Sequence, residues 1–178
     1  MQKVQEKDVM FKSAMYYLDK LGFSVIPVGK DKKPLIPWQQ FQTRKPTRAE
    51  VMDWWLIKFH SANIGIVTGK VSDLVVIDID DTSKKHDILD NIIEMASPPM
   101  CDTPRGGKHL YFKYPNAEIR NTVEILEKVD IRGEGGYVVA PPSQNGNGKN
   151  YAWIKGKKIT DTLTTELPQS IISLYNKR

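Results

Sequence analysis

The sequence predicts an α+β fold, because helix and strand patterns are mixed along the chain without a regular βαβ rhythm. A second observation agrees with this, since most of the second half reads as short strands separated by glycine and proline turns. The chain has 178 residues, of which 40% are hydrophobic and 26% charged, as expected for one globular domain or one two-lobed unit.

The first half alternates helices with strands. Apolar positions near helical spacing predict a helix over residues 5–21, which Gly22 ends. Thr47 and Glu50 have capping-box spacing and predict a helix from Thr47 to about Lys58. The other expected elements are strands at 23–28, 63–68 and 74–80, a loop at 29–46, and a helix at about 83–95.

The second half is expected to consist mainly of strands. A turn at 103–108 precedes a strand at 109–114, and the pair Pro141-Pro142 stops another at 137–140. Short strands are also expected at 128–132 and 151–154, followed by a last helix at about 168–175.

Two aspartates end the most apolar strand of the chain. In a strand, residues two apart share a face, so Asp78 and Asp80 project side by side, roughly 6 to 7 Å apart by strand rise. Paired carboxylates at this position resist desolvation, and divalent cations would compensate their charge. The competing interpretation is a strand end whose aspartates cap the next helix, although capping does not require Asp78.

Two further segments carry candidate site residues. The turn and strand start formed by Arg105, Gly106, Gly107, Lys108 and His109 have the cations and exposed backbone N–H groups of a triphosphate-binding loop. A hairpin turn with solvated charges is an equally good interpretation of this turn. Asp130 lies on a short strand with Arg132 on the same face, either as a third metal ligand or as a structural ion pair, and Glu134 is a rival ligand.

The charge distribution adds a basic surface to these segments. The net charge is +5, and residues 30–48 contribute six cations opposed only by Asp31. The cations of this candidate nucleic-acid-binding segment are Lys30, Lys32, Lys33, Arg44, Lys45 and Arg48, although a solvated loop is the simpler interpretation of a charge run. Together, three carboxylates, a histidine and a basic glycine turn are the groups that two-metal phosphoryl or nucleotidyl transfer requires.

The order of these segments resembles the primase–polymerase (prim-pol) domain of the archaeo-eukaryotic primase superfamily, which is common in plasmid and phage replication proteins. The resemblance covers about residues 10–155. The matching segments are 21–28, Lys33-Pro34 with Trp38, Trp54-Trp55, 63–69, 74–80, 103–112 and 130–143.

The resemblance implies a modified RRM-like catalytic sheet packed with an N-terminal α/β module. It also implies that Asp78, Asp80 and Asp130 bind two Mg²⁺ or Mn²⁺ ions and that His109 contacts nucleotide phosphates. Arg105, Lys108 and Arg132 are added to the nucleotide site on charge and position. The implied activity is template-dependent primase or polymerase nucleotidyl transfer, acting on DNA and on NTPs or dNTPs.

The sequence departs from the family pattern in two places. The family usually has serine or threonine two residues before the histidine, whereas Gly107 stands here. Relatives often continue into a helical priming domain and a helicase. Residues 156–178 are too short for either, so this helical tail is interpreted as the end of a fragment or of a minimal stand-alone enzyme.

Several alternatives stay open at this point. The same acids suit a metal-dependent nuclease, and a non-catalytic replication-initiator module is a third hypothesis, whereas the absence of any H-x-H argues against a relaxase. Ribo- or deoxyribonucleotide preference and de novo priming are undecided. With Cys101 as the only cysteine, no signal peptide and no apolar run of about 20 residues, we expect no zinc site, no membrane partner and a cytoplasmic location.

Overall fold

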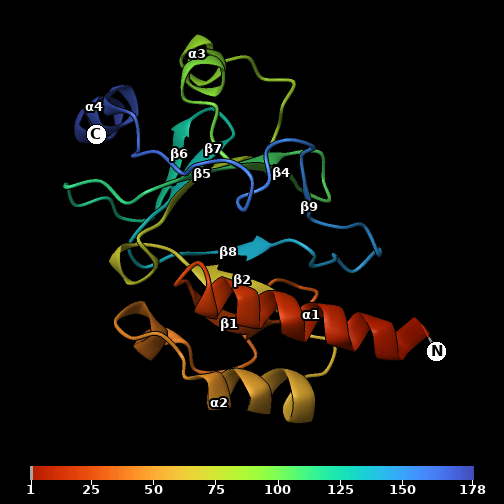
Figure 1. Ribbon diagram of the computed structural model, residues 1–178. Helices are drawn as coiled ribbons and strands as arrows, with labels where there is room; N and C mark the ends of the chain where they lie inside the picture. Colours follow the sequence, from red (N-terminus) through yellow and green to blue (C-terminus); the bar gives the residue numbers. More distant parts are fainter. Residues whose placement is uncertain (1) are drawn as a thin grey trace.

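The structure, a computed structural model that describes residues 2–178, consists of two antiparallel sheets stacked between two pairs of helices (Figure 1). The helices are α1 (Gln2–Asp19), α2 (Arg48–Met52), α3 (Asp87–Ala96) and α4 (Gln169–Asn176). The strands are β1 (Ser24–Val28), β2 (Asn63–Val67), β3 (Val75–Ile79), β4 (Met100–Asp102), β5 (Lys108–Phe112), β6 (Thr122–Leu126), β7 (Val129–Arg132), β8 (Tyr137–Ala140) and β9 (Ala152–Trp153).

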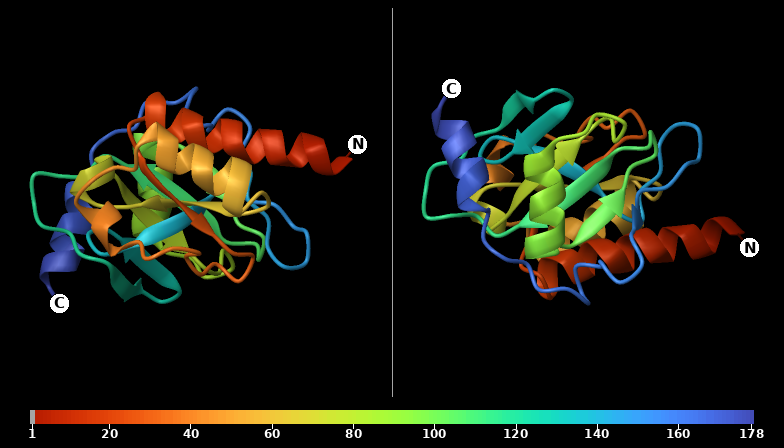
Figure 2. Two further views of the ribbon diagram at one scale, coloured as in Figure 1. Left: turned by 90° about the horizontal axis from the view of Figure 1, so that it is seen from below. Right: turned by 90° about the horizontal axis from the view of Figure 1, so that it is seen from above.

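The two sheets divide the molecule into lobes. The smaller sheet has the order β1-β2-β8, and α1 and α2 cover its outer face. We call this sheet, its two helices and the segments that join them the N-terminal lobe. The larger sheet has the order β6-β7-β3-β5-β4-β9, and α3 and α4 lie on its outer face, as the views from below and above show (Figure 2). The α+β prediction is therefore confirmed, with the inner faces of the two sheets packed on each other.

Strand alternation decides which residues lie between the sheets. Along β3, Val75 and Ile77 belong to the outer core beneath α3 and α4, whereas Val76 belongs to the core shared by the two sheets. Side chains two apart share a face, so Asp78 is on the same side as Val76 and faces the N-terminal lobe. The apolar run of β3 therefore anchors a carboxylate at the edge of the space between the sheets.

Several element boundaries differ from the sequence expectation. The predicted Thr47 helix has its capping box, but after α2 it continues as a π-helical turn at Asp53–Lys58. The helix expected at 83 begins only at Asp87, because the Asp81 side chain accepts a hydrogen bond from the Ser83 N–H and holds a turn there. Strands β4 and β6 were not predicted. In the part of the chain that the structure describes, no helix has the length and apolarity needed to cross a bilayer.

Candidate active site

Three adjacent strands of the larger sheet bring the main site residues together. β3 lies between β5 and β7, and both neighbours are antiparallel to it. Asp78 is directly opposite His109 on one side and directly opposite Asp130 on the other. Directly opposed residues point to the same face, so register alone aligns these three side chains in a row across the sheet.

Arg132 links the two carboxylates of this row. Its guanidinium donates to Asp78 Oδ2 at 3.1 Å and to Asp130 Oδ2 at 2.7 Å. The other Asp130 oxygen accepts a hydrogen bond from the Glu124 N–H at 2.8 Å. The Asp78 and Asp130 side chains are only 14% and 10% exposed, so an unpaired charge at either position would be costly.

His109 completes the row as a buried cation. Its Nε2 lies 3.3 Å from Asp78 Oδ1, and its side chain is 6% exposed. Burial opposes the charged imidazole, but the interactions with Asp78 and Cys101 together outweigh it and raise the pKa of His109 to about 9. Burial likewise disfavours the Asp78 carboxylate, yet His109 and Arg132 together lower its pKa. Asp78 therefore stays ionised between two positive groups.

Asp80 has a different environment, one residue beyond the end of β3. Its side chain has no ion-pair partner among the described residues. Partial burial and the charges of Asp78 and Asp130 raise the pKa of Asp80, while Arg132 and Lys32 oppose the rise. The site thus keeps uncompensated negative potential at Asp80.

The glycine turn at 103–108 packs closely against the end of β3. A Cβ on Gly107 would lie 2.2 Å from the Ile79 carbonyl oxygen, so the backbone approach requires glycine. The Gly107 N–H donates to Thr103 Oγ1 within the turn. Lys108 pairs with Asp102 at 2.5 Å, which leaves Arg105 as the turn's cation at the cavity described next.

Two adjoining cavities meet at this row. The larger has a volume of about 600 Å³ and the smaller about 240 Å³. Asp78, His109, Tyr151 and Lys32 line both. The larger cavity is also lined by Lys30, Asp31, Asp80, Thr103, Pro104, Arg105, Asn145, Gly146, Asn147 and Lys149. The smaller is also lined by Asn121, Arg132, Gly135, Gly136, Tyr137, Val138 and Val139.

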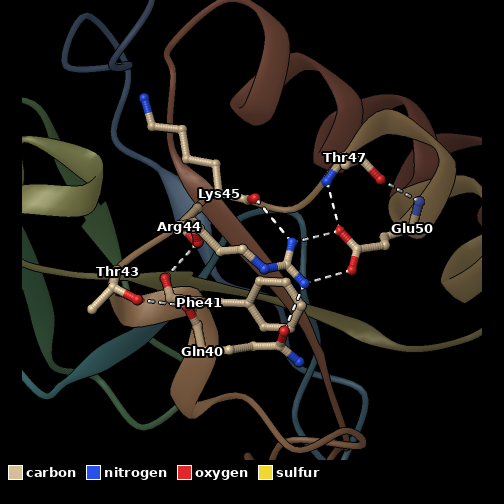
Figure 3. Close-up of polar contacts among 8 residues, drawn as sticks. Gln40, Phe41, Thr43, Arg44, Lys45, Thr47 and Glu50 are labelled. Carbon is tan, nitrogen blue, oxygen red and sulfur yellow. Dashed lines mark hydrogen bonds and ion pairs between the residues drawn. The ribbon is translucent and has the colours of Figure 1, made fainter.

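The structure separates the predicted basic segment into two groups. Lys30 and Lys32 reach the larger cavity, whereas Lys33, Arg44, Lys45 and Arg48 line neither cavity. Arg44 lies over the Phe41 ring and pairs with Glu50 at 2.8 Å, as Figure 3 shows, and Arg48 pairs with Asp19. Arg44 and Arg48 thus form exposed ion pairs within the N-terminal lobe and lie outside the candidate site.

Glu134, the rival ligand, also lies outside both cavities. Its Oε1 accepts a hydrogen bond from the Lys70 N–H at 2.7 Å, and its carboxylate packs against Gly69. Glu134 therefore connects the loop before β8 to the segment between β2 and β3.

Tyr151 and Lys149 are cavity residues that sequence reasoning missed. The Tyr151 ring centroid lies 5.8 Å from that of His109, and burial raises the pKa of Tyr151 to about 12. Lys149 lies on the loop between β8 and β9 that borders the larger cavity. The local sequence gives no signal for either residue, because Tyr151 lies in an ordinary strand pattern and Lys149 in a polar turn.

The carboxylate oxygens of this site are of the ligand type that binds divalent metal ions. Oxygen ligands are those that Mg²⁺ and Mn²⁺ prefer. Burial raises the pKa of Asp80, and so do the neighbouring charges of Asp78 and Asp130, which a cation would offset. As the described side chains stand, no three acidic, histidine or cysteine groups form a ready metal cluster. Arg132 bonds to both Asp78 and Asp130, so a metal ion would have to share or replace its contacts.

Comparison with known proteins identifies one family that matches this chain. Residues 14–170 match the family described as "Prim-Pol: Bifunctional DNA primase/polymerase, N-terminal". A comparison with curated proteins returned no match.

Proposed function

The chain belongs to the Prim-Pol family, and we propose from this premise that it is a template-dependent DNA primase or polymerase that joins (d)NTPs and releases pyrophosphate. The family implies a nucleotidyltransferase that acts on DNA and nucleotides. The observation that carries the proposal is the row of Asp130, Asp78 and His109 across three strands, of which Asp78 and His109 line a cavity of about 600 Å³. That volume is within the range of about 300–1,000 Å³ typical of small-ligand sites.

Asp78, Asp80 and Asp130 are the residues that would hold the metals. Two divalent ions at these carboxylates would supply activation of a 3′-hydroxyl and neutralisation of the leaving pyrophosphate. The protein's own contribution is to keep Asp78 ionised through His109 and Arg132, and to hold Asp78 directly opposite Asp130 on neighbouring strands.

The cations around the larger cavity suit a triphosphate. His109, with a pKa of about 9, carries a positive charge at neutral pH and lines the cavity wall. Arg105 comes from the glycine turn and Lys149 from the loop before β9, so positive groups face the cavity from different segments. Charge-assisted contacts of this kind orient phosphates through several donors at once.

Primer extension by an Asp78→Asn variant tests the proposal. This change keeps the shape of the side chain but removes its charge, and we expect extension with Mg²⁺ or Mn²⁺ to fall by at least about 100-fold. Asp73→Asn is the matched control, because Asp73 is exposed, lies outside both cavities and has a left-handed backbone that asparagine tolerates. Equal extension rates for Asp78→Asn and wild type would rule out the proposed chemistry at this site.

A further inference from the structure

A tight turn after β1 carries Lys32 to the site. The Lys32 N–H donates to the Gly29 carbonyl at 2.9 Å, and the Gly29 N–H donates to the Lys33 carbonyl at 2.7 Å. The Lys33 N–H donates to Asp31 Oδ1 at 3.1 Å. Lys32 has a φ of 69°, a left-handed conformation that a lysine adopts only where the surroundings enforce it. The turn therefore sets the direction of the Cα–Cβ bond of Lys32.

A contact from β8 fixes the same turn. The Tyr137 hydroxyl donates to the Lys32 carbonyl oxygen at 2.9 Å. The Tyr137 ring packs edge-on against Trp38, with centroids 5.0 Å apart. The backbone of Lys32 is thus held from two sides, by its own turn and by the smaller sheet.

Lys32 occupies a distinctive position between the two cavities. It is one of the four residues that line both, and the other three, Asp78, His109 and Tyr151, lie on or next to strands of the larger sheet. Lys32 is the member of this set that the N-terminal lobe contributes. Among the described side chains it has no ion-pair partner, in contrast to Arg44 and Arg48 of the same basic segment.

The carboxylates that line the larger cavity explain why a lysine at this position would help to bind a phosphate. Asp78 and Asp80 present carboxylates to the larger cavity, and these would repel an incoming polyphosphate. Lys32 lines the same cavity as these two carboxylates. A lysine ammonium on this wall would offset the repulsion between the carboxylates and the phosphates.

We propose that Lys32 binds the phosphates of a nucleoside triphosphate at the junction of the two cavities and so connects the N-terminal lobe to the nucleotide. This inference rests on the proposed nucleotidyl-transfer function. It assigns Lys32 to the nucleotide and separates it from the four cations of the basic segment that line neither cavity, Lys33, Arg44, Lys45 and Arg48.

Calorimetric titration with dATP and Mg²⁺ tests this assignment. We expect Lys32→Gln to weaken dATP binding by about tenfold or more, because one charge-assisted contact to phosphate is lost. Lys20→Gln is the control, since Lys20 is an exposed lysine of the N-terminal lobe that lines neither cavity, and it should bind dATP within about twofold of wild type.

Two further variants keep the test independent of folding. Lys32→Asn places a residue that favours left-handed backbone at this position, so the turn is preserved while the charge is lost, and it should weaken dATP binding as Lys32→Gln does. Lys32→Arg should retain most of the affinity. If the folded neutral variants bind dATP as tightly as wild type does, Lys32 is not a phosphate ligand. If wild type itself binds no dATP, the proposed function fails, and this inference with it.

Discussion

Arg132 provides positive charge where the reaction is proposed to need metal ions. It donates to both Asp78 and Asp130, whose side chains are largely buried. Removing one partner of a buried ion pair leaves an uncompensated charge and typically costs about 3–5 kcal/mol. We infer that Arg132 stabilises the two carboxylates in the metal-free protein and competes with metal ions for them.

Arg132→Met tests this competition at the residue scale. We expect Mn²⁺, titrated by calorimetry, to bind the variant about tenfold more tightly, because no guanidinium has to be displaced. Mn²⁺ should also raise the melting temperature of the variant more than that of wild type. Arg120→Met, which alters an exposed pair with Glu118 outside both cavities, is the control. Unchanged Mn²⁺ affinity in Arg132→Met would contradict the competition.

At the element scale, the capping box of α2 is supported by an ion pair. Thr47 Oγ1 accepts from the Glu50 N–H, and the Glu50 carboxylate accepts from the Thr47 N–H and from Arg44 (Figure 3). The hydrogen bond from Arg44 is the largest cause that lowers the pKa of Glu50 to about 2. The stabilisation from the Glu50 carboxylate is therefore present above its ordinary pKa and is lost as the pH falls toward about 2.

Urea unfolding of Glu50→Gln at several pH values tests this linkage. We expect a loss of at most about 1 kcal/mol near pH 7, because both partners are partly exposed. The difference from wild type should shrink as the pH is lowered from 5 to about 2, because the wild-type carboxylate is then protonated as well. Glu94→Gln on the exposed face of α3 is the matched control. A difference that does not change with pH would mean that the Glu50 charge does not stabilise the helix.

The elements that were not predicted are those with weak local patterns. β4 has only three residues and follows two prolines, so no alternation can be recognised in it. β6 lies at the edge of the larger sheet and has an irregular register with β7, including Glu124 at a φ of 50°. Both strands form because a neighbouring strand offers hydrogen bonds. By contrast, β3 and the α2 cap were predictable because their signals lie within a few consecutive residues.

At the scale of the whole molecule, the two lobes share a core. Buried side chains from β1 and β2 of the smaller sheet pack with Val76 of β3, Cys101 of β4 and Tyr111 of β5. If one lobe unfolded alone, the apolar side chains that the other lobe contributes to the shared core would be exposed to water. We therefore expect the two lobes to unfold together.

Chemical denaturation followed by two probes tests this cooperativity. Of the four tryptophans, Trp38, Trp54 and Trp55 belong to the N-terminal lobe and Trp153 to the larger sheet, so fluorescence reports mainly on the N-terminal lobe. Circular dichroism reports on the strands and helices of both lobes. We expect the two transitions to coincide, and separate midpoints would show that each lobe is stable alone.

The sequence by itself determined the parts of this protein that depend on local geometry. The period of two in a strand aligns Asp78 with Val76, and capping spacing starts α2 at Arg48 after Thr47. Only the tertiary structure decided which distant residues meet: Asp78 with His109 and Asp130, Arg132 between the acids, and Lys32 apart from Arg44 and Arg48. The physical reason is that backbone dihedrals set the direction of a side chain within a few residues, whereas strand register and burial between segments far apart in the chain set its neighbours.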